Sequence, residues 1–156
     1  MFSILQAAPE DAAVIHEIQM RAFEEEARLS GTRQIPPLME TVGAVELLIR
    51  TQTVLVAREA VRIVGSARGV VEGPVCTLRG VVVEPSHQGR GIGAALVRAV
   101  EQWHPEVERF QLTTNTLVPG NVAFYERHGY RVDELTKYGV KIVLAQMSKP
   151  AHAGDD

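Results

Sequence analysis

The chain has 156 residues, 46% hydrophobic and 22% charged, which suits one globular domain with a sizeable core. The formal net charge of −3 argues against a general nucleic-acid-binding surface. The single cysteine, Cys76, excludes an internal disulfide, and the five histidines lack metal-ligand spacing, so we expect no metal. No stretch has the pattern of a signal peptide or a membrane span, so we expect a cytoplasmic protein without membrane partners.

The first half of the chain alternates helical periodicity with β-branched runs. Ala12, Ile15, Ile18 and Ala22 recur at helical spacing behind a helix-starting proline. The predicted elements are a strand over 2–6, a helix from Pro9 to about Arg28, a loop over 30–37, a helix capped by Thr41, strands over 53–57 and 61–71 around a turn at 58–60, and a strand over 75–83.

The most informative stretch joins the strand over 75–83 to the next helix, and it reads Pro85-Ser86-His87-Gln88-Gly89-Arg90-Gly91-Ile92-Gly93. Glycine lets a backbone approach a ligand closely, and a helix N-terminus offers unpaired N–H groups and the positive end of a dipole. Arg90 adds donors that suit phosphate oxygens. The stretch therefore predicts a phosphate or pyrophosphate site, and a glycine-rich turn without a ligand is the alternative.

Two common phosphate-binding loops do not fit these residues. Ala94 and Ala95 stand where a Walker loop needs lysine and then serine or threonine. The alternate glycines do not match the dinucleotide fingerprint, and Phe110, Gln111 and Leu112 lie where that fingerprint needs an acid.

The second half continues the alternation of helix and strand. The predicted elements are a helix from Ile92 with an apolar stripe that reaches Trp103, a strand over 109–113, a helix from Pro119 that Gly129 ends, and strands over 130–135 and 140–147. We expect a single domain over 1–149, an α/β fold with a mixed sheet and helices on both faces, and a loose tail over 150–156.

The glycine stretch resembles the acetyl-CoA-binding motif of the GNAT superfamily of N-acetyltransferases, Q/R-x-x-G-x-G/A after a strand that ends in V-x-P. Val83-Glu84-Pro85 is the lead-in, and Gln88, Gly91 and Gly93 fill the motif. The resemblance implies the GNAT acyl-CoA N-acyltransferase fold, with the sheet splayed between the strands over 75–83 and 109–113, and acetyl-CoA as cosubstrate. It implies that Val81 and Val83 pair with the pantetheine arm and acetyl carbonyl, and that the pyrophosphate binds the backbone amides of Gln88, Gly89, Arg90, Gly91, Ile92 and Gly93.

The stretch over 118–130 resembles a second part of the family, N…A…F/L-Y-E-R-x-G-F/Y. The resemblance implies that Tyr125 gives a proton to the departing CoA thiolate and that Asn121 steadies the cofactor, although Val118 fills the commonest asparagine position. A phenol near the sulfur can act as a general acid. A core tyrosine hydrogen-bonded to backbone is the alternative, and we expect Phe124 and Tyr130 in the core.

A general base is less evident. Some GNAT relatives carry a glutamate in the strand before the motif, where this chain has only Thr77-Leu78-Arg79-Gly80. Glu84 is the candidate base, with a solvated loop carboxylate as the alternative. Glu24, Glu25 and Glu26 form an acidic run that is either a solvated face or an attraction for a cationic amine. His87 and His128 are expected at the surface.

These features favour an acetyltransferase that moves acetyl from acetyl-CoA to a small-molecule amine by direct attack. Two alternatives stay open: acetylation of a protein N-terminus or lysine, and a CoA-binding sensor without turnover. The resemblance also implies a possible homodimer.

Overall fold

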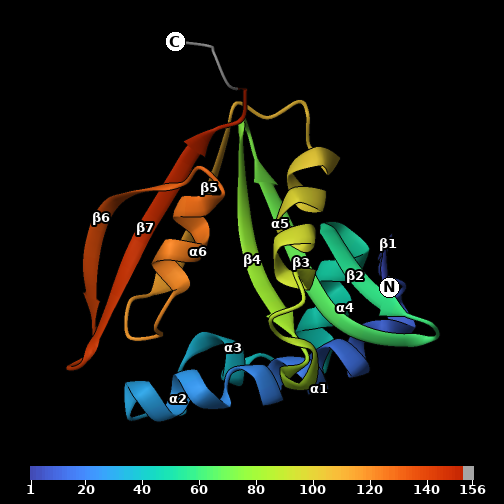
Figure 1. Cartoon of the computed structure of the whole chain (residues 1–156), viewed down its shortest axis with the longest axis horizontal. Helices are drawn as coiled ribbons and strands as arrows, with labels where there is room; N and C mark the ends of the chain where they lie inside the picture. Colours follow the sequence, from blue (N-terminus) through green and yellow to red (C-terminus); the bar gives the residue numbers. More distant parts are fainter. Residues whose placement is uncertain (153–156) are drawn as a thin grey trace.

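The computed structural model describes residues 1–152, and within them seven strands form one sheet in the order β1-β2-β3-β4-β5-β7-β6 (Figure 1). The strands are β1 Ser3–Gln6, β2 Thr53–Glu59, β3 Arg62–Glu72, β4 Val75–Val83, β5 Arg109–Asn115, β6 Arg131–Tyr138 and β7 Ile142–Pro150. β4 and β5 run parallel, and the other neighbouring strands are antiparallel. The predicted mixed sheet is confirmed.

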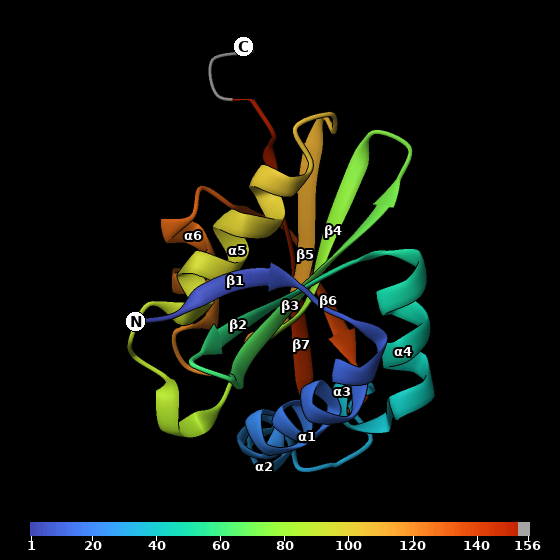
Figure 2. The ribbon, with the colours of Figure 1, turned by 90° about the vertical axis from the view of Figure 1, so that its right-hand side faces the viewer.

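Helices cover both faces of this sheet, with α5 and α6 on one face and α1 and α4 on the other (Figures 1 and 2). The helices are α1 Ala12–Ala22, α2 Glu24–Ser30, α3 Pro36–Met39, α4 Val42–Thr51, α5 Ile92–Trp103 and α6 Asn121–Arg127, with 3-10 turns η1 Pro9–Asp11 and η2 Pro85–His87. No helix within residues 1–152 is both long enough and apolar enough to cross a membrane.

Two hydrophobic cores lie on the two faces of the sheet, because successive side chains of a strand point in opposite directions. In β2, Leu55 and Ala57 pack with α5, whereas Val54 and Val56 pack with α1 and α4. The predicted stripe of α5 is largely right, except that Trp103 is 47% exposed. Its indole lies beyond the last core contact of the helix.

The predicted first helix is wrong as a single element. It is broken at Phe23, which separates α1 from α2. Phe23 packs against both neighbouring apolar clusters. The buried residues of α1 face the sheet, whereas Ala27 of α2 packs with Ile35 and with Ile142 of β7. One straight helix cannot reach both surfaces, so the break directs α2 toward the other half of the sheet.

Other predicted boundaries shift by a few residues. The β2–β3 turn is Ala60 and Val61, with Ala60 in a left-handed conformation and Val61 at 90% exposure outside the strand. The helix predicted from Pro119 begins at Asn121, and the last two strands lie later than expected. β7 ends at Pro150, one residue past the predicted domain end. Positions 153–156 of the predicted tail lie outside the described residues.

β4 and β5 pair over only three residues each and then diverge, which confirms the predicted splay (Figure 1). The pairing covers 75–77 of β4 and 109–111 of β5. β4 carries an extra residue opposite Ser66 and Arg68, and Gly80 in this bulge has φ +58°. A β-bulge bends its strand, so β4 turns away from β5 beyond the paired residues. The carboxyl ends of both strands point toward α1 and α2.

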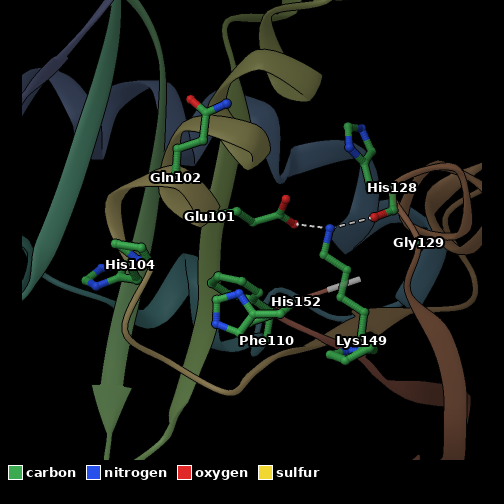
Figure 3. A pocket seen from close by; sticks show the side chains of 11 residues that line it. Glu101, Gln102, His104, Phe110, His128, Gly129, Lys149 and His152 are labelled. Carbon is green, nitrogen blue, oxygen red and sulfur yellow. Dashed lines mark hydrogen bonds and ion pairs between the residues drawn. The ribbon is translucent and has the colours of Figure 1, made fainter. Parts of the chain in front are cut away.

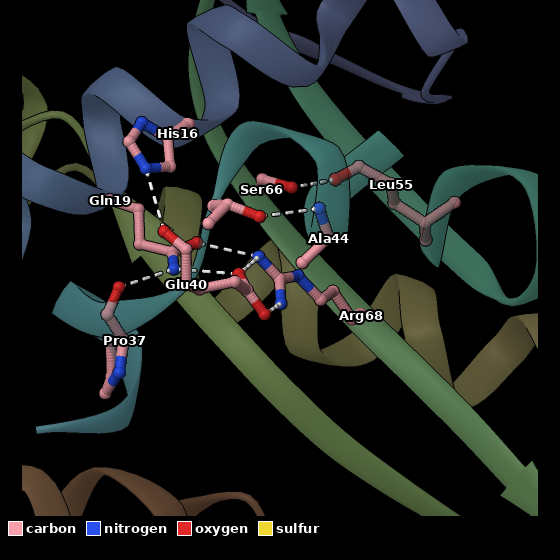
Figure 4. A network of polar contacts seen from close by, with 9 residues as sticks. His16, Gln19, Pro37, Glu40, Ala44, Leu55, Ser66 and Arg68 are labelled. Carbon is pink, nitrogen blue, oxygen red and sulfur yellow. Dashed lines mark hydrogen bonds and ion pairs between the residues drawn. The ribbon is translucent and has the colours of Figure 1, made fainter. Parts of the chain in front are cut away.

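A buried polar network holds α1 against the sheet at this bulge (Figure 4). Arg68 of β3 donates to both carboxylate oxygens of Glu40, at 2.7 and 3.0 Å, and to Gln19 Oε1 of α1 at 2.7 Å. Gln19 Nε2 donates to Glu40 Oε1 at 2.9 Å. Burial alone would raise the pKa of Glu40, but the hydrogen bonds and charge of Arg68 lower it below its ordinary value. The pair therefore stays charged inside the fold.

Candidate active site

The glycine stretch forms an open loop between the end of β4 and the start of α5. Gly89 and Gly91 both have φ +82°, and Gly91 is the residue before the first helical turn. The backbone N–H groups of 89–94 find no acceptor in the part of the chain that the structure describes. A side-chain carbon added at Gly91 would meet nothing within 4 Å. The loop thus presents a row of free donors and needs glycine for its conformation.

The charged groups of this loop are held by the end of β2. Arg90 is exposed and lies 3.5 Å from Glu59, the last residue of β2. His87 was expected at the surface, but it is 8% exposed and lies 3.4 Å from the same carboxylate. The ring packs under the loop because η2 turns it inward. Arg90 therefore stays at the loop rim, where its charge adds to that of the helix N-terminus.

Beside the loop, the edge of β4 that faces β5 is unpaired, because β5 has diverged from it. Val81 and Val83 are half-buried against the core below α5. Beyond Thr77, β5 no longer pairs with β4, so the peptide groups on that side are left without a sheet partner. A side-chain carbon on Gly93 would lie 3.7 Å from both Phe124 and Val83, so α5, α6 and β4 approach one another here.

Tyr125 is half-buried on α6, between the rings of Phe124 and Tyr130 at centroid distances of 5.0 and 6.0 Å. No group within residues 1–152 hydrogen-bonds its hydroxyl, whereas Tyr130 donates to Glu101 at 2.7 Å. Burial, with a smaller effect from the charge of Glu26, raises the pKa of Tyr125 to about 12. The phenol is therefore protonated at neutral pH and has its proton free to donate, unlike a core tyrosine tied to backbone.

Asn121 lies one helical turn before Tyr125 and fixes the start of α6 to β5. Its Nδ2 donates to Thr114 Oγ1 at 3.1 Å. Asn115, the last residue of β5, is 4% exposed and donates to Ser30 Oγ of α2 at 3.0 Å. Sequence reasoning missed Asn115, because its link to α2 joins positions 85 residues apart.

Glu84 lies at the start of the loop. Neither interpretation of the sequence, a general base or a solvated loop carboxylate, describes its surroundings. The solvated-loop interpretation is wrong, since Glu84 is 6% exposed. Arg21 of α1 donates to both carboxylate oxygens at 2.8 Å. The Arg21 hydrogen bonds lower the pKa of Glu84 despite its burial. A carboxylate held in this way accepts a proton poorly, so its predicted role as base is not favoured by its contacts.

Cys76 lies in β4 and belongs to the hydrophobic core on the α5 side of the sheet. It is fully buried, and burial raises the pKa of its thiol to about 11. The thiol is therefore protonated at neutral pH, which suits a packed core side chain rather than a nucleophile.

A cavity of about 510 Å³ lies at the opposite end of α5, about 18 Å along the helix from the glycine loop (Figure 3). Lys149 crosses it, with Nζ 2.8 Å from both Glu101 and the His128 carbonyl. Its lining also includes Phe110 and His152. None of the predicted site residues lines it, so the candidate active site is the glycine loop and the diverging strands.

A loop of free amides at the head of α5, beside two parallel strands that separate, is the arrangement that the resemblance to the GNAT enzymes implies. The family profile described as the acetyltransferase (GNAT) domain matches residues 50–132. The chain belongs to this family of acetyltransferases. No curated protein matches it in sequence.

Several solved structures share the fold of this chain. A GNAT-family acetyltransferase from Streptococcus pneumoniae is 20% identical, with 96% of this chain and 99% of that chain covered and a TM-score of 0.76. A phosphinothricin acetyltransferase from Sinorhizobium meliloti in complex with acetyl-CoA is 16% identical, with 96% and 88% covered and a TM-score of 0.76. A ribosomal-protein-alanine N-acetyltransferase from Brucella melitensis is 21% identical, with 95% and 99% covered and a TM-score of 0.73.

Proposed function

We propose that this protein transfers an acetyl group from acetyl-CoA directly to the amine of a small molecule. The observation that carries the proposal is the row of free N–H groups over 89–94, at the head of α5 and beside the unpaired edge of β4. Such groups bind pyrophosphate oxygens without needing a metal or a lysine. The acetyl-CoA bound to the Sinorhizobium meliloti neighbour supports the same cosubstrate here.

In this proposal, residues of the chain bind acetyl-CoA, stabilise the oxyanion and protonate the leaving thiolate. Arg90 and the loop amides would bind the phosphates, and the β4 edge at Val81 and Val83 would align the pantetheine arm. Free backbone amides beside the thioester carbonyl would stabilise the oxyanion that forms on attack. Tyr125 would protonate the leaving thiolate, since its hydroxyl keeps its proton at neutral pH. Asn121 would hold α6 in place for that transfer.

Substitution of Gly91 by valine tests the cofactor site. The new side chain would fill the space that the phosphates need, so CoA binding measured by isothermal titration should be lost. Gly139→Val is the matched control, because Gly139 has φ +69°, an added carbon meets nothing within 4 Å there, and it lies in the β6–β7 turn. Equal CoA affinity in folded Gly91→Val and Gly139→Val proteins would contradict the proposal.

A panel of acceptors tests the reaction itself. Wild-type protein should release CoA thiol in the presence of acetyl-CoA and small primary amines, and more slowly with the matching alcohols. Faster acetylation of peptide N-termini or lysines than of any small amine would favour a protein acceptor. Tight CoA binding without turnover on either panel would indicate a sensor.

A further inference from the structure

The acidic run at the start of α2 is divided by the structure into two kinds of carboxylate. Glu24 pairs with Arg33 and Glu25 pairs with Arg28, and all four side chains are more than half exposed. Glu26 points inward and is half-buried. Within residues 1–152, no lysine, arginine or histidine lies within ion-pair distance of it. One carboxylate of the three therefore lies inside the fold without a cationic partner.

Glu26 lies at the open ends of the diverging strands. Asn115 Nδ2, at the end of β5, is 3.4 Å from Glu26 Oε2 and donates to Ser30 Oγ at 3.0 Å. Asn115 Oδ1 accepts from the Leu117 N–H at 3.0 Å, which fixes the orientation of its amide. In Figure 1, α1 and α2 run below the sheet, with α1 under the end of β4 and α2 under α6. The Asn115 contacts therefore hold the carboxylate at the end of the split opposite to the paired residues.

Glu26 and Tyr125 are coupled electrostatically. The Glu26 charge is near enough to add to the rise in the pKa of Tyr125. Burial in turn raises the pKa of Glu26, and the Asn115 hydrogen bond only partly offsets this. Such a carboxylate accepts a proton more readily near neutral pH than a solvated one does.

We propose that Glu26 binds the ammonium group of the acceptor and takes its proton, which makes it a catalytic residue and selects amines as the substrate class. This inference rests on the proposed function. An ammonium group would supply the cationic partner that Glu26 lacks within the described residues. Entry from the α2 side would bring the acceptor to the open carboxyl end of the split, the end at which the glycine loop also begins.

The proton balance of this reaction closes without a further reactant. The ammonium gives one proton to Glu26, which passes it to solvent, and the neutral amine forms a C–N bond to the thioester carbonyl. The C–S bond breaks, Tyr125 gives its proton to the thiolate, and the second proton of the nitrogen restores the phenol. An ammonium and acetyl-CoA thus yield an amide, CoA thiol and one released proton.

Glu26→Gln is the test, because it keeps the side-chain size and removes the charge. We expect kcat/KM for a primary amine to fall by about 10²-fold or more, with CoA affinity from isothermal titration unchanged. The loss should shrink as the pH rises toward 10, because a growing fraction of the amine is then neutral in solution. Asn115 and Ser30 do not titrate, and Tyr125 is the titratable side chain, within residues 1–152, whose pKa the charge of Glu26 affects.

Glu25→Gln is the matched control, one residue away on the same helix with the same change of charge. Its kcat/KM should stay within about twofold of wild type. Glu26→Asp keeps the carboxylate, so its kcat/KM should lie between those of wild type and Glu26→Gln. Such an intermediate value would show that the loss in Glu26→Gln is not due to misfolding. Equal kcat/KM in Glu26→Gln and Glu25→Gln would overturn the Glu26 assignment alone. Wild-type protein that fails to bind CoA would overturn the proposed function and this inference with it.

Discussion

Two neighbouring tyrosines differ in the partners of their hydroxyls, and we propose different roles for them on that ground. Tyr130 is 3% exposed and donates to Glu101, which itself pairs with Lys149. Tyr125 has no such partner within the described residues, so its proton is not committed to the fold. At this scale, the difference between the structural phenol and the proposed catalytic phenol is one hydrogen bond.

Tyr125→Phe removes the hydroxyl and keeps the ring contacts. We expect turnover to fall by about 10²-fold, because the thiolate loses its proton donor, and CoA binding to remain. Thermal unfolding should change little, since the described structure gives the hydroxyl no hydrogen bond to lose. Tyr130→Phe is the comparison and should lower stability by about 1 kcal/mol through its lost bond to Glu101. Turnover of Tyr125→Phe equal to wild type would mean that another group protonates the thiolate.

At the scale of elements, the bulge in β4 controls the divergence of the sheet. Gly80 has φ +58°, and a carbon added there would lie 2.9 Å from Arg68 Nε. Arg68 cannot move aside freely, because Glu40 and Gln19 hold its guanidinium. The bulge, the buried ion pair and the position of α1 are therefore one unit.

Gly80→Ala should destabilise the fold by about 2 kcal/mol or more, through a strained left-handed alanine and the contact with Arg68. Gly73→Ala is a close control, since Gly73 also has φ +58° but an added carbon there meets nothing within 4 Å. Comparing the urea unfolding of the two variants separates the cost of a left-handed alanine from the cost of the contact with Arg68. Equal losses would show that Arg68 yields to the new methyl group without penalty.

Periodicity and turn residues were enough to predict the element types and the loop at the head of α5, whereas the splayed strand pair was implied by the resemblance to the GNAT family. Local patterns could not show that Phe23 breaks a helix, because the reason is the packing of α2 on a distant strand. They also treated Glu24, Glu25 and Glu26 alike. Which acid points inward depends on where α2 crosses the sheet, and Asn115 lies 89 residues away from Glu26. The burial of Glu84 depends in the same way on Arg21 of another element.

At the scale of the whole molecule, two buried carboxylates couple stability to pH. The pKa values of Glu40 and Glu84 are lowered by Arg68 and Arg21 against the effect of burial. A folded-state pKa below the ordinary 4.5 stabilises the fold above that pH, and the stabilisation is lost as pH falls through the folded value. Glu26 acts in the opposite sense, because its pKa is raised.

The free energy of unfolding should therefore fall as pH drops from about 5 to about 3, as measured by urea denaturation. Glu84→Gln should cost about 1 kcal/mol at pH 7, a modest loss because Arg21 is half exposed, and should flatten this fall. An unchanged pH slope in Glu84→Gln would assign the acid sensitivity to Glu40 or to other groups.

The short contact between β4 and β5 has a mechanical consequence. Three residue pairs join the strands from β1 to β4 to those from β5 to β7, so the sheet has two leaves with a narrow seam. A molecule lodged between the leaves would brace them, and saturation at a hundred times its dissociation constant would add about 2.7 kcal/mol to stability. Amide hydrogen exchange should then slow most in the leaf formed by β5, β7 and β6, because fewer helices pack on it. Exchange rates in that leaf would therefore report whether a molecule is bound between the two leaves.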